Sequence, residues 1–232
     1  GKGKIFLGPL HPQAVTELTR RISLTNSIEQ IMTSRIDNLP AIPQEVLKTA
    51  SVVGMQFDVK LLVAVLSSRY TLEQVEVAVD SLQEHGIVAV TSVQDGIQGQ
   101  FCHTTMQDVA YKVLSEADRT ALHMRIAQIL EETHIDELLS KDAGGRCDVA
   151  ATLANHFEMA GRTLRSIFYY NLAGELAMLL DGHHRDTAGI FKKVIELSKL
   201  GIKTDLPAVA SDNDGPQPSY SADIDVISIA KW

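Results

Sequence analysis

Residues 71–86 read TLEQVEVAVDSLQEHG, and this stretch decides the fold. Its apolar residues recur at helical spacing, at Leu72, Val75, Val79 and Leu82. Thr71 and Gln74 have the spacing of a capping box, in which each residue satisfies a backbone N–H at the start of a helix. Gly86 can supply the left-handed residue that commonly closes a helix. The sequence therefore predicts a helix over 71–85.

Two extended runs follow this helix. They are IVAVTSV at 87–93 and IQGQFCHT at 97–104, and Asp95-Gly96 between them is a strong hairpin signal. Helical periodicity resumes with Met106, Val109, Ala110, Val113 and Leu114. Upstream, helices are expected over 27–39, 44–53 and 59–66. This order predicts a mainly α fold, with a winged helix-turn-helix domain over 25–140 whose wing is the short β-hairpin.

The flanking segments extend this plan at both ends. Residues 5–10 read as a short strand and Pro12 as the start of a helix, so 1–24 resembles the trailing edge of a preceding domain. In the next helix the apolar residues expected to face inward are Ile28, Ile31, Met32 and Ile36.

Downstream, a helix over 116–132 has an apolar face formed by Leu122, Ile126, Ile129 and Leu130, and 141–146 reads as a loop. Helices over 151–161, 163–180 and 186–197 then predict tetratricopeptide-like hairpins at the start of a repeat array over 148–202. Small residues suit the places where these helices cross, namely Ala173, Gly174 and Ala177. The acidic tail over 203–232 is expected to be disordered, although 226–230 could add an edge strand.

Composition narrows the class of protein. The net charge of −8 and the isoelectric point near 5.4 argue against a surface for nucleic acid or anionic membrane. Cys102 and Cys147 are too few for a disulfide framework and favour two free thiols in a reducing cytosol. No apolar run has transmembrane length, so we expect a cytoplasmic protein without membrane insertion. The missing initiator Met suggests a fragment.

The predicted winged helix lacks the chemistry of a DNA reader. Such a helix needs donors for base edges and cations for phosphates. Between 71 and 85 there is no Lys or Arg, and there are four acids, Glu73, Glu76, Asp80 and Glu84. We therefore expect a packing module and no nucleic-acid partner.

No catalytic or metal-binding motif is present. The sequence lacks a P-loop, H-E-x-x-H, C-x-x-C and G-x-S-x-G. His183 and His184 could bind a metal beside Asp181 and Asp186, but adjacent loop histidines favour solvent-exposed polar residues. His156 is expected to be a packed histidine. We predict neither a catalytic residue nor a metal ligand.

Several segments together resemble the region that follows the nucleotide-binding core of STAND/AAA-type ATPases. They are FLGPLHPQAVTEL at 6–18, NSIEQIMTSRIDNLP at 26–40, VLKTASVVGMQF at 46–57, FCHTTMQDVAYKVL at 101–114, LHMRIA at 122–127 and HFEMAG at 156–161. The resemblance covers roughly residues 5 to 200. Within that group the chain looks most like the region downstream of the cyclase domains in soluble class III adenylate cyclases. Related regions occur in bacterial cyclase-ATPase fusions and in LuxR-type regulators.

The resemblance implies a parent protein that makes cyclic AMP from ATP, with ATP and Mg bound upstream of this chain. Residues 1–24 would be the last strand and lid helix of the ATPase domain, although the usual lid segment is missing between Ile22 and Leu24. The rest would be a non-catalytic regulatory or scaffolding region. Its partners would be the upstream ATPase and cyclase domains and proteins bound by the helical repeats. The alternatives are a fragment of a STAND-type transcriptional regulator and a plain helical scaffold.

The resemblance carries one site residue onto this chain. His103 matches a histidine that can approach bound nucleotide in related winged helices, and it would need the upstream ATPase core as its partner. The other interpretation of His103 is a helix cap or a hydrogen-bonded core residue.

Overall fold

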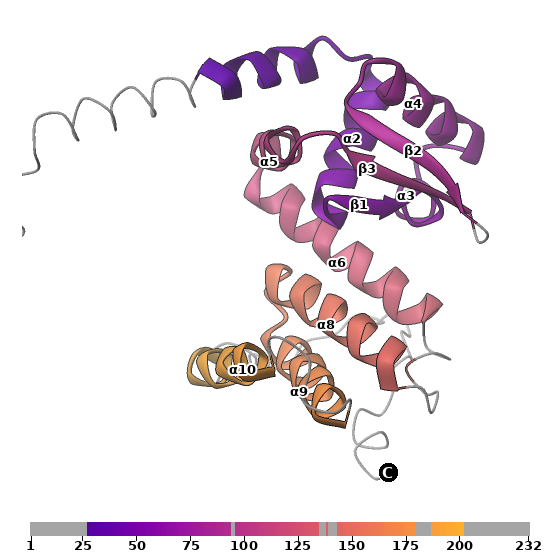
Figure 1. Ribbon diagram of the computed structural model, residues 1–232. Helices are drawn as coiled ribbons and strands as arrows, with labels where there is room; N and C mark the ends of the chain where they lie inside the picture. Colours follow the sequence, from indigo (N-terminus) through magenta and orange to yellow (C-terminus); the bar gives the residue numbers. More distant parts are fainter. Residues whose placement is uncertain (1–26, 94–95, 135–137, 139–142, 180–186, 202–232) are drawn as a thin grey trace, which may run out of the picture.

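Two packed regions lie on either side of one long helix, α6 (Glu116–Thr133), in the computed structural model (Figure 1). The structure describes residues 27–93, 96–134, 138, 143–179 and 187–201. Within these ranges the chain is mainly helical and carries a small three-stranded antiparallel sheet.

The region before α6 combines helices with the sheet. Its elements are a helix over 27–37, α2 (Ala41–Val53), β1 (Gln56–Asp58), α3 (Val59–Leu66), α4 (Leu72–Glu84), β2 (Val88–Val93), β3 (Gly96–Phe101) and α5 (Thr104–Val113). Their apolar faces form one cluster, in which Leu47, Leu62, Leu82 and Phe101 are among the fully buried side chains. This cluster is largely aliphatic, as the low aromatic content of 5% requires.

The predicted helix over 71–85 is α4, and its capping box is confirmed. The Thr71 hydroxyl accepts a hydrogen bond from the Gln74 backbone N–H at 3.3 Å, and the Gln74 side chain accepts one from the Thr71 N–H at 2.9 Å. Gly86 has a φ of 63°, the left-handed conformation expected of a closing glycine. Val75, Val79 and Leu82 are buried, whereas Leu72, which shares their helical spacing, is the first residue of the helix and is 54% exposed.

The predicted hairpin is β2 and β3, but the sheet contains a third strand that the sequence did not reveal. β3 lies in the middle, with β1 and β2 antiparallel on its two sides. In the β1–β3 pair, Phe57 lies directly opposite Gly99. β1 has only three residues, so it carries no periodic signal and forms through its pairing with β3.

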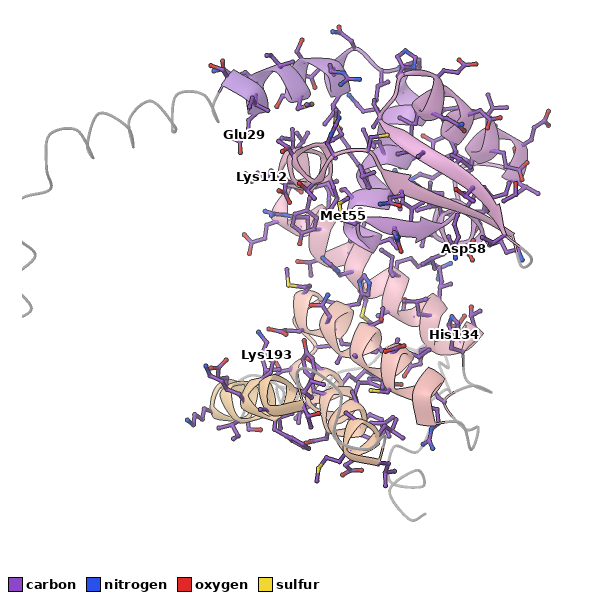
Figure 2. The ribbon with its side chains drawn as sticks, in the orientation of Figure 1. Glu29, Met55, Asp58, Lys112, His134 and Lys193 are labelled. Carbon is purple, nitrogen blue, oxygen red and sulfur yellow. The ribbon has the colours of Figure 1, made fainter. Side chains whose placement is uncertain are left out.

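Two predictions near the start of the described chain need correction. α2 begins at Ala41 and not at residue 44, because a proline at 43 falls in the first turn, where backbone N–H groups need no partner within the helix. In the helix over 27–37, Ile28 and Ile31 are 46% and 59% exposed, although both were expected to face inward. This helix extends past the core it packs on, with Glu29 beside Lys112 of α5 (Figures 1 and 2).

Beyond α6 the chain continues as α8 (Ala143–Met159), α9 (Thr163–Leu179) and α10 (Thr187–Gly201). Each helix packs on the next, from α6 to α8, α8 to α9 and α9 to α10. α8 begins within the segment predicted to be a loop, since burial of Cys147 and Ala150 on its inner face outweighs the low helix propensity of glycine. Gly161 follows the end of α8 and has a φ of 70°, the left-handed conformation expected of a glycine that closes a helix.

Close helix crossings occur at the small residues that the sequence suggested. Ala173 and Ala177 are fully buried, and a Cβ placed on Gly174 would lie 2.8 Å from the ring of Phe191 on α10. The predictions for 1–24, for the tail over 203–232 and for His183 and His184 lie outside the described residues. No helix in the described ranges is both long and apolar enough to cross a membrane.

Candidate functional site

His103, the residue expected to contact a nucleotide, lies between β3 and α5. It occupies the N-cap position of α5, but its side chain makes no capping hydrogen bond and is exposed to solvent. Cys102 beside it is also exposed and is a free thiol. The interpretation of His103 as a helix cap is therefore confirmed for its position, with its backbone carbonyl accepting from the Met106 N–H, whereas the interpretation as a core residue is wrong. Its ring is open to a group outside the described residues.

The outer face of α4 has the acidic character that the sequence predicts. Glu73, Asp80 and Glu84 are exposed and Glu76 is half-buried. The sequence did not predict a cation near the hairpin. In the structure the Lys60 side chain lies against Gly96, where an added Cβ would be 3.0 Å from Lys60 Cε. Lys60 therefore lies at the turn end of the hairpin, and the exposed face of α4 is acidic.

The most unusual polar group in the described chain is a line of three side chains from three helices, of which two are buried and one is half-buried. The Tyr111 hydroxyl on α5 lies 3.0 Å from Nε2 of His123 on α6. Nδ1 of His123 lies 2.9 Å from Nδ1 of His156 on α8. The two imidazoles are 4% and 2% exposed. This Tyr111–His123–His156 chain therefore connects the sheet-bearing region to the helical hairpins.

The geometry limits how many protons the chain can carry. Two Nδ1 atoms facing each other at 2.9 Å can share one hydrogen, with one ring donating and the other accepting. If Tyr111 donates to His123 Nε2, then His123 must donate through Nδ1 to His156. When both rings are protonated, each Nδ1 carries a hydrogen and two N–H groups lie opposite each other. The contact is therefore compatible with two neutral rings and is broken by charging both.

The environment keeps both histidines neutral. Burial, followed by the charge of Arg119, lowers the pKa of His123 to about 4. The guanidinium of Arg119 lies over the Tyr111 ring at 5.2 Å from its centroid. Burial, followed by the neighbouring His123, lowers the pKa of His156 to about 4. The site can fix three helices relative to one another.

The expectation that His156 is a packed histidine is confirmed, but its partner was missed. His123 lies three residues before Ile126 and seven before Leu130, so the same helical spacing that marked these core residues places His123 on their face. That spacing is the sequence signal that could have predicted the burial of His123. The meeting of His123 with His156 has no signature in the sequence, because it depends on how α6 packs against α8.

Two carboxylates reinforce the helical region beyond α6. Glu131 on α6 accepts hydrogen bonds from Tyr169 and Arg165 of α9. Glu158 on α8 accepts one from Tyr170 at 3.0 Å and pairs with Lys193 of α10 at 2.7 Å. Burial raises the pKa of both tyrosines, so they stay protonated and donate. These contacts connect each helix with its neighbours.

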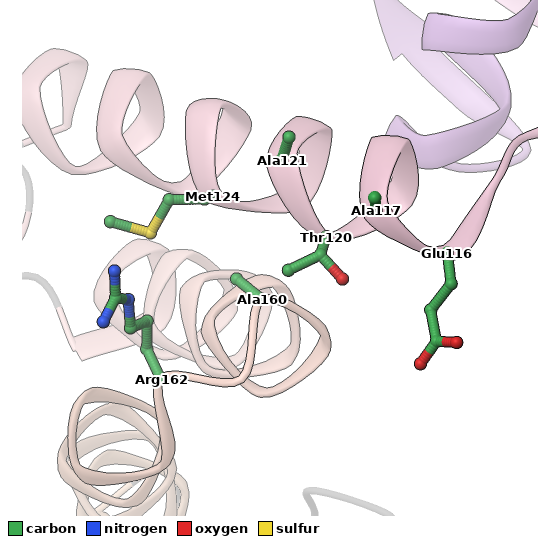
Figure 3. A pocket seen from close by; sticks show the side chains of 7 residues that line it. All are labelled: Glu116, Ala117, Thr120, Ala121, Met124, Ala160 and Arg162. Carbon is green, nitrogen blue, oxygen red and sulfur yellow. The ribbon is translucent and has the colours of Figure 1, made fainter.

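The hollows on the surface do not coincide with these titratable groups. An open groove of about 720 Å³ lies between α6 and the turn after α8 (Figure 3). A second hollow of about 550 Å³ lies between α2, the end of α3 and α6, where Glu45 pairs with Arg69. Among the described residues, no group of three or more metal-binding side chains occurs. Neither hollow is lined by His123, His156, Tyr169 or Tyr170.

Comparison of the chain with protein-family models, with curated proteins and with solved structures gave no match.

Proposed function

We propose that this chain is a non-catalytic regulatory or scaffolding region of a larger signalling protein, of the kind found in soluble adenylate cyclases. The observation that carries the proposal is the double packing of α6. Ile126 and Ile129 of α6 join a cluster with α2 and α3, whereas Ala127 joins the cluster of α8 and α9. One helix thus contributes to two hydrophobic clusters. A displacement of one packed region would therefore move α6 and, through it, the other region.

The order of elements before α6 supports a winged helix within this module. Helix α2, strand β1, helices α3 and α4 and the hairpin β2–β3 follow the sequence of elements in that motif. The acidic outer face of α4, in the position of a recognition helix, supports a role in packing against protein. The region beyond α6 supports the tetratricopeptide-like interpretation, since consecutive helices pack on each other through small residues.

Absence of DNA binding is the expected result for the isolated chain. Four acids on α4 would face the phosphates of a duplex and repel them. Fluorescence anisotropy with a labelled duplex of about 30 base pairs, at about 0.1 M salt, should show no binding at micromolar protein. Salt-sensitive binding in this range would contradict the role of α4 and would favour a transcriptional regulator.

In the full proposal the parent protein binds ATP and Mg and makes cyclic AMP, and His103 faces the nucleotide-binding core. The exposed ring at the start of α5 supports this placement, because it is free to contact another domain. The purified chain with Mg and ATP should release no phosphate and form no cyclic AMP above a blank. Turnover that is lost in His103→Ala, while Cys102→Ala keeps it, would overturn the non-catalytic role.

A further inference from the structure

The groove beside α6 has a floor of short side chains. Ala117, Thr120, Ala121 and Met124 lie along one face of α6, and Ala160 at the end of α8 forms the opposite wall (Figure 3). Short side chains let two helix backbones approach closely. Ala117, Thr120 and Ala121 are all exposed. This α6 groove, defined by these five residues, is shaped to receive another helix.

The groove continues an interface that the protein already uses. The same face of α6 passes on to Glu131, where Tyr169 and Arg165 of α9 cover it. α9 begins at Thr163, directly after the turn that borders the groove. The C-terminal half of this face is therefore a helix-packing surface, and its N-terminal half is the same kind of surface, which no helix of the described ranges covers.

Opposite charges mark the two ends of the groove. Glu116 lies at the N-terminal end of α6, and Arg162 lies at the other end beside Met124 (Figure 3). Both residues are exposed, and neither side chain pairs with another described residue. A two-fold axis perpendicular to the groove, near Ala121, exchanges the two ends. It would place Glu116 of each copy against Arg162 of the other.

We propose that the occupant of the α6 groove is the α6 helix of a second copy of this chain. Antiparallel packing of the two α6 helices brings the short side chains together in the centre and makes the ion pair Glu116–Arg162 twice. This two-fold complementarity is what an isologous dimer requires. Only seven residues line the groove, so we expect the association to be weak and to depend on concentration and salt. The inference does not depend on the proposed function.

Charge reversal provides a sharp test. In Glu116→Arg two arginines face each other at both ends, and in Arg162→Glu two glutamates do. Sedimentation equilibrium of the full chain, up to about 200 µM, should show a monomer–dimer equilibrium in the unmodified protein and about tenfold weaker association in each variant. A mixture of the two variants should restore association, because each pairing between unlike chains again joins an acid to a base.

Two further variants complete the design. Glu132→Arg reverses an exposed charge on the same helix, outside the groove, and should leave association unchanged. Ala121→Glu places a carboxylate at the centre of the groove and should abolish association, while circular dichroism confirms an intact helical fold. A chain that stays monomeric throughout, a dimer that tolerates the reversals as well as it tolerates Glu132→Arg, or a mixture that fails to associate would each overturn the proposal. In the first case the groove would belong to a different protein helix.

Discussion

Lowering the pH from 7 to 5 is expected to reduce the free energy of unfolding by about 2 kcal/mol for each of His123 and His156. In the folded protein burial lowers both pKa values to about 4, from an ordinary value of 6.5. Below pH 6.5 the unfolded chain therefore binds protons that the folded chain does not. The stabilisation is complete above pH 6.5 and is lost as the pH falls towards 4. The charged or titratable groups at the pair are Arg119 and Tyr111, and neither offsets this loss.

Urea unfolding followed by circular dichroism at pH 7, 6 and 5 measures this dependence. The double variant His123→Asn/His156→Asn removes both titrations and should flatten the curve, whatever its stability at pH 7. His103→Asn replaces an exposed histidine and is the matched control, which should keep the steep dependence. Equal slopes for the unmodified protein and the double variant would show that the buried pair does not control acid stability.

Amphipathic periodicity predicted the helices that place one face on the core. The helix predicted over 59–66 is α3 with the same bounds, and the cap of α4 involves the residues expected from spacing. In both cases local chemistry and tertiary burial favour the same conformation. Prediction failed where they differ, as at the first turn of α8, where Gly144 and Gly145 disfavour a helix that packing imposes.

Contacts between distant segments account for what the sequence could not show. His123 and His156 are 33 positions apart, and only the packing of α6 on α8 brings their Nδ1 atoms together. Each histidine alone reads as a polar residue on a helix. The α6 groove is similar, since its alanines are ordinary helix formers until the turn after α8 supplies the second wall. A single sequence shows the residues that form the histidine pair and the α6 groove, but it does not show that these residues lie close together in space.

Gly99→Ala is expected to destabilise the protein by about 2 to 4 kcal/mol, a large effect for one added methyl group. A Cβ on Gly99 would lie 2.3 Å from two ring carbons of Phe57, which faces Gly99 across the β1–β3 pair. Phe57 is 3% exposed and packs edge-on against Phe101, with ring centroids 5.8 Å apart. The ring cannot move aside within the core, so the methyl group displaces it or separates the strands.

A comparison with Gly86→Ala isolates the steric cause of this effect. Gly86 has a φ of 63° and no atom within 4 Å of an added Cβ, so its substitution carries only the backbone cost of about 1 kcal/mol. The double variant Phe57→Ala/Gly99→Ala should be less destabilised than the sum of the two single variants, since the added methyl group then enters space the ring has left. Additive losses, or a Gly99→Ala cost no larger than that of Gly86→Ala, would contradict the close approach of Phe57 to Gly99.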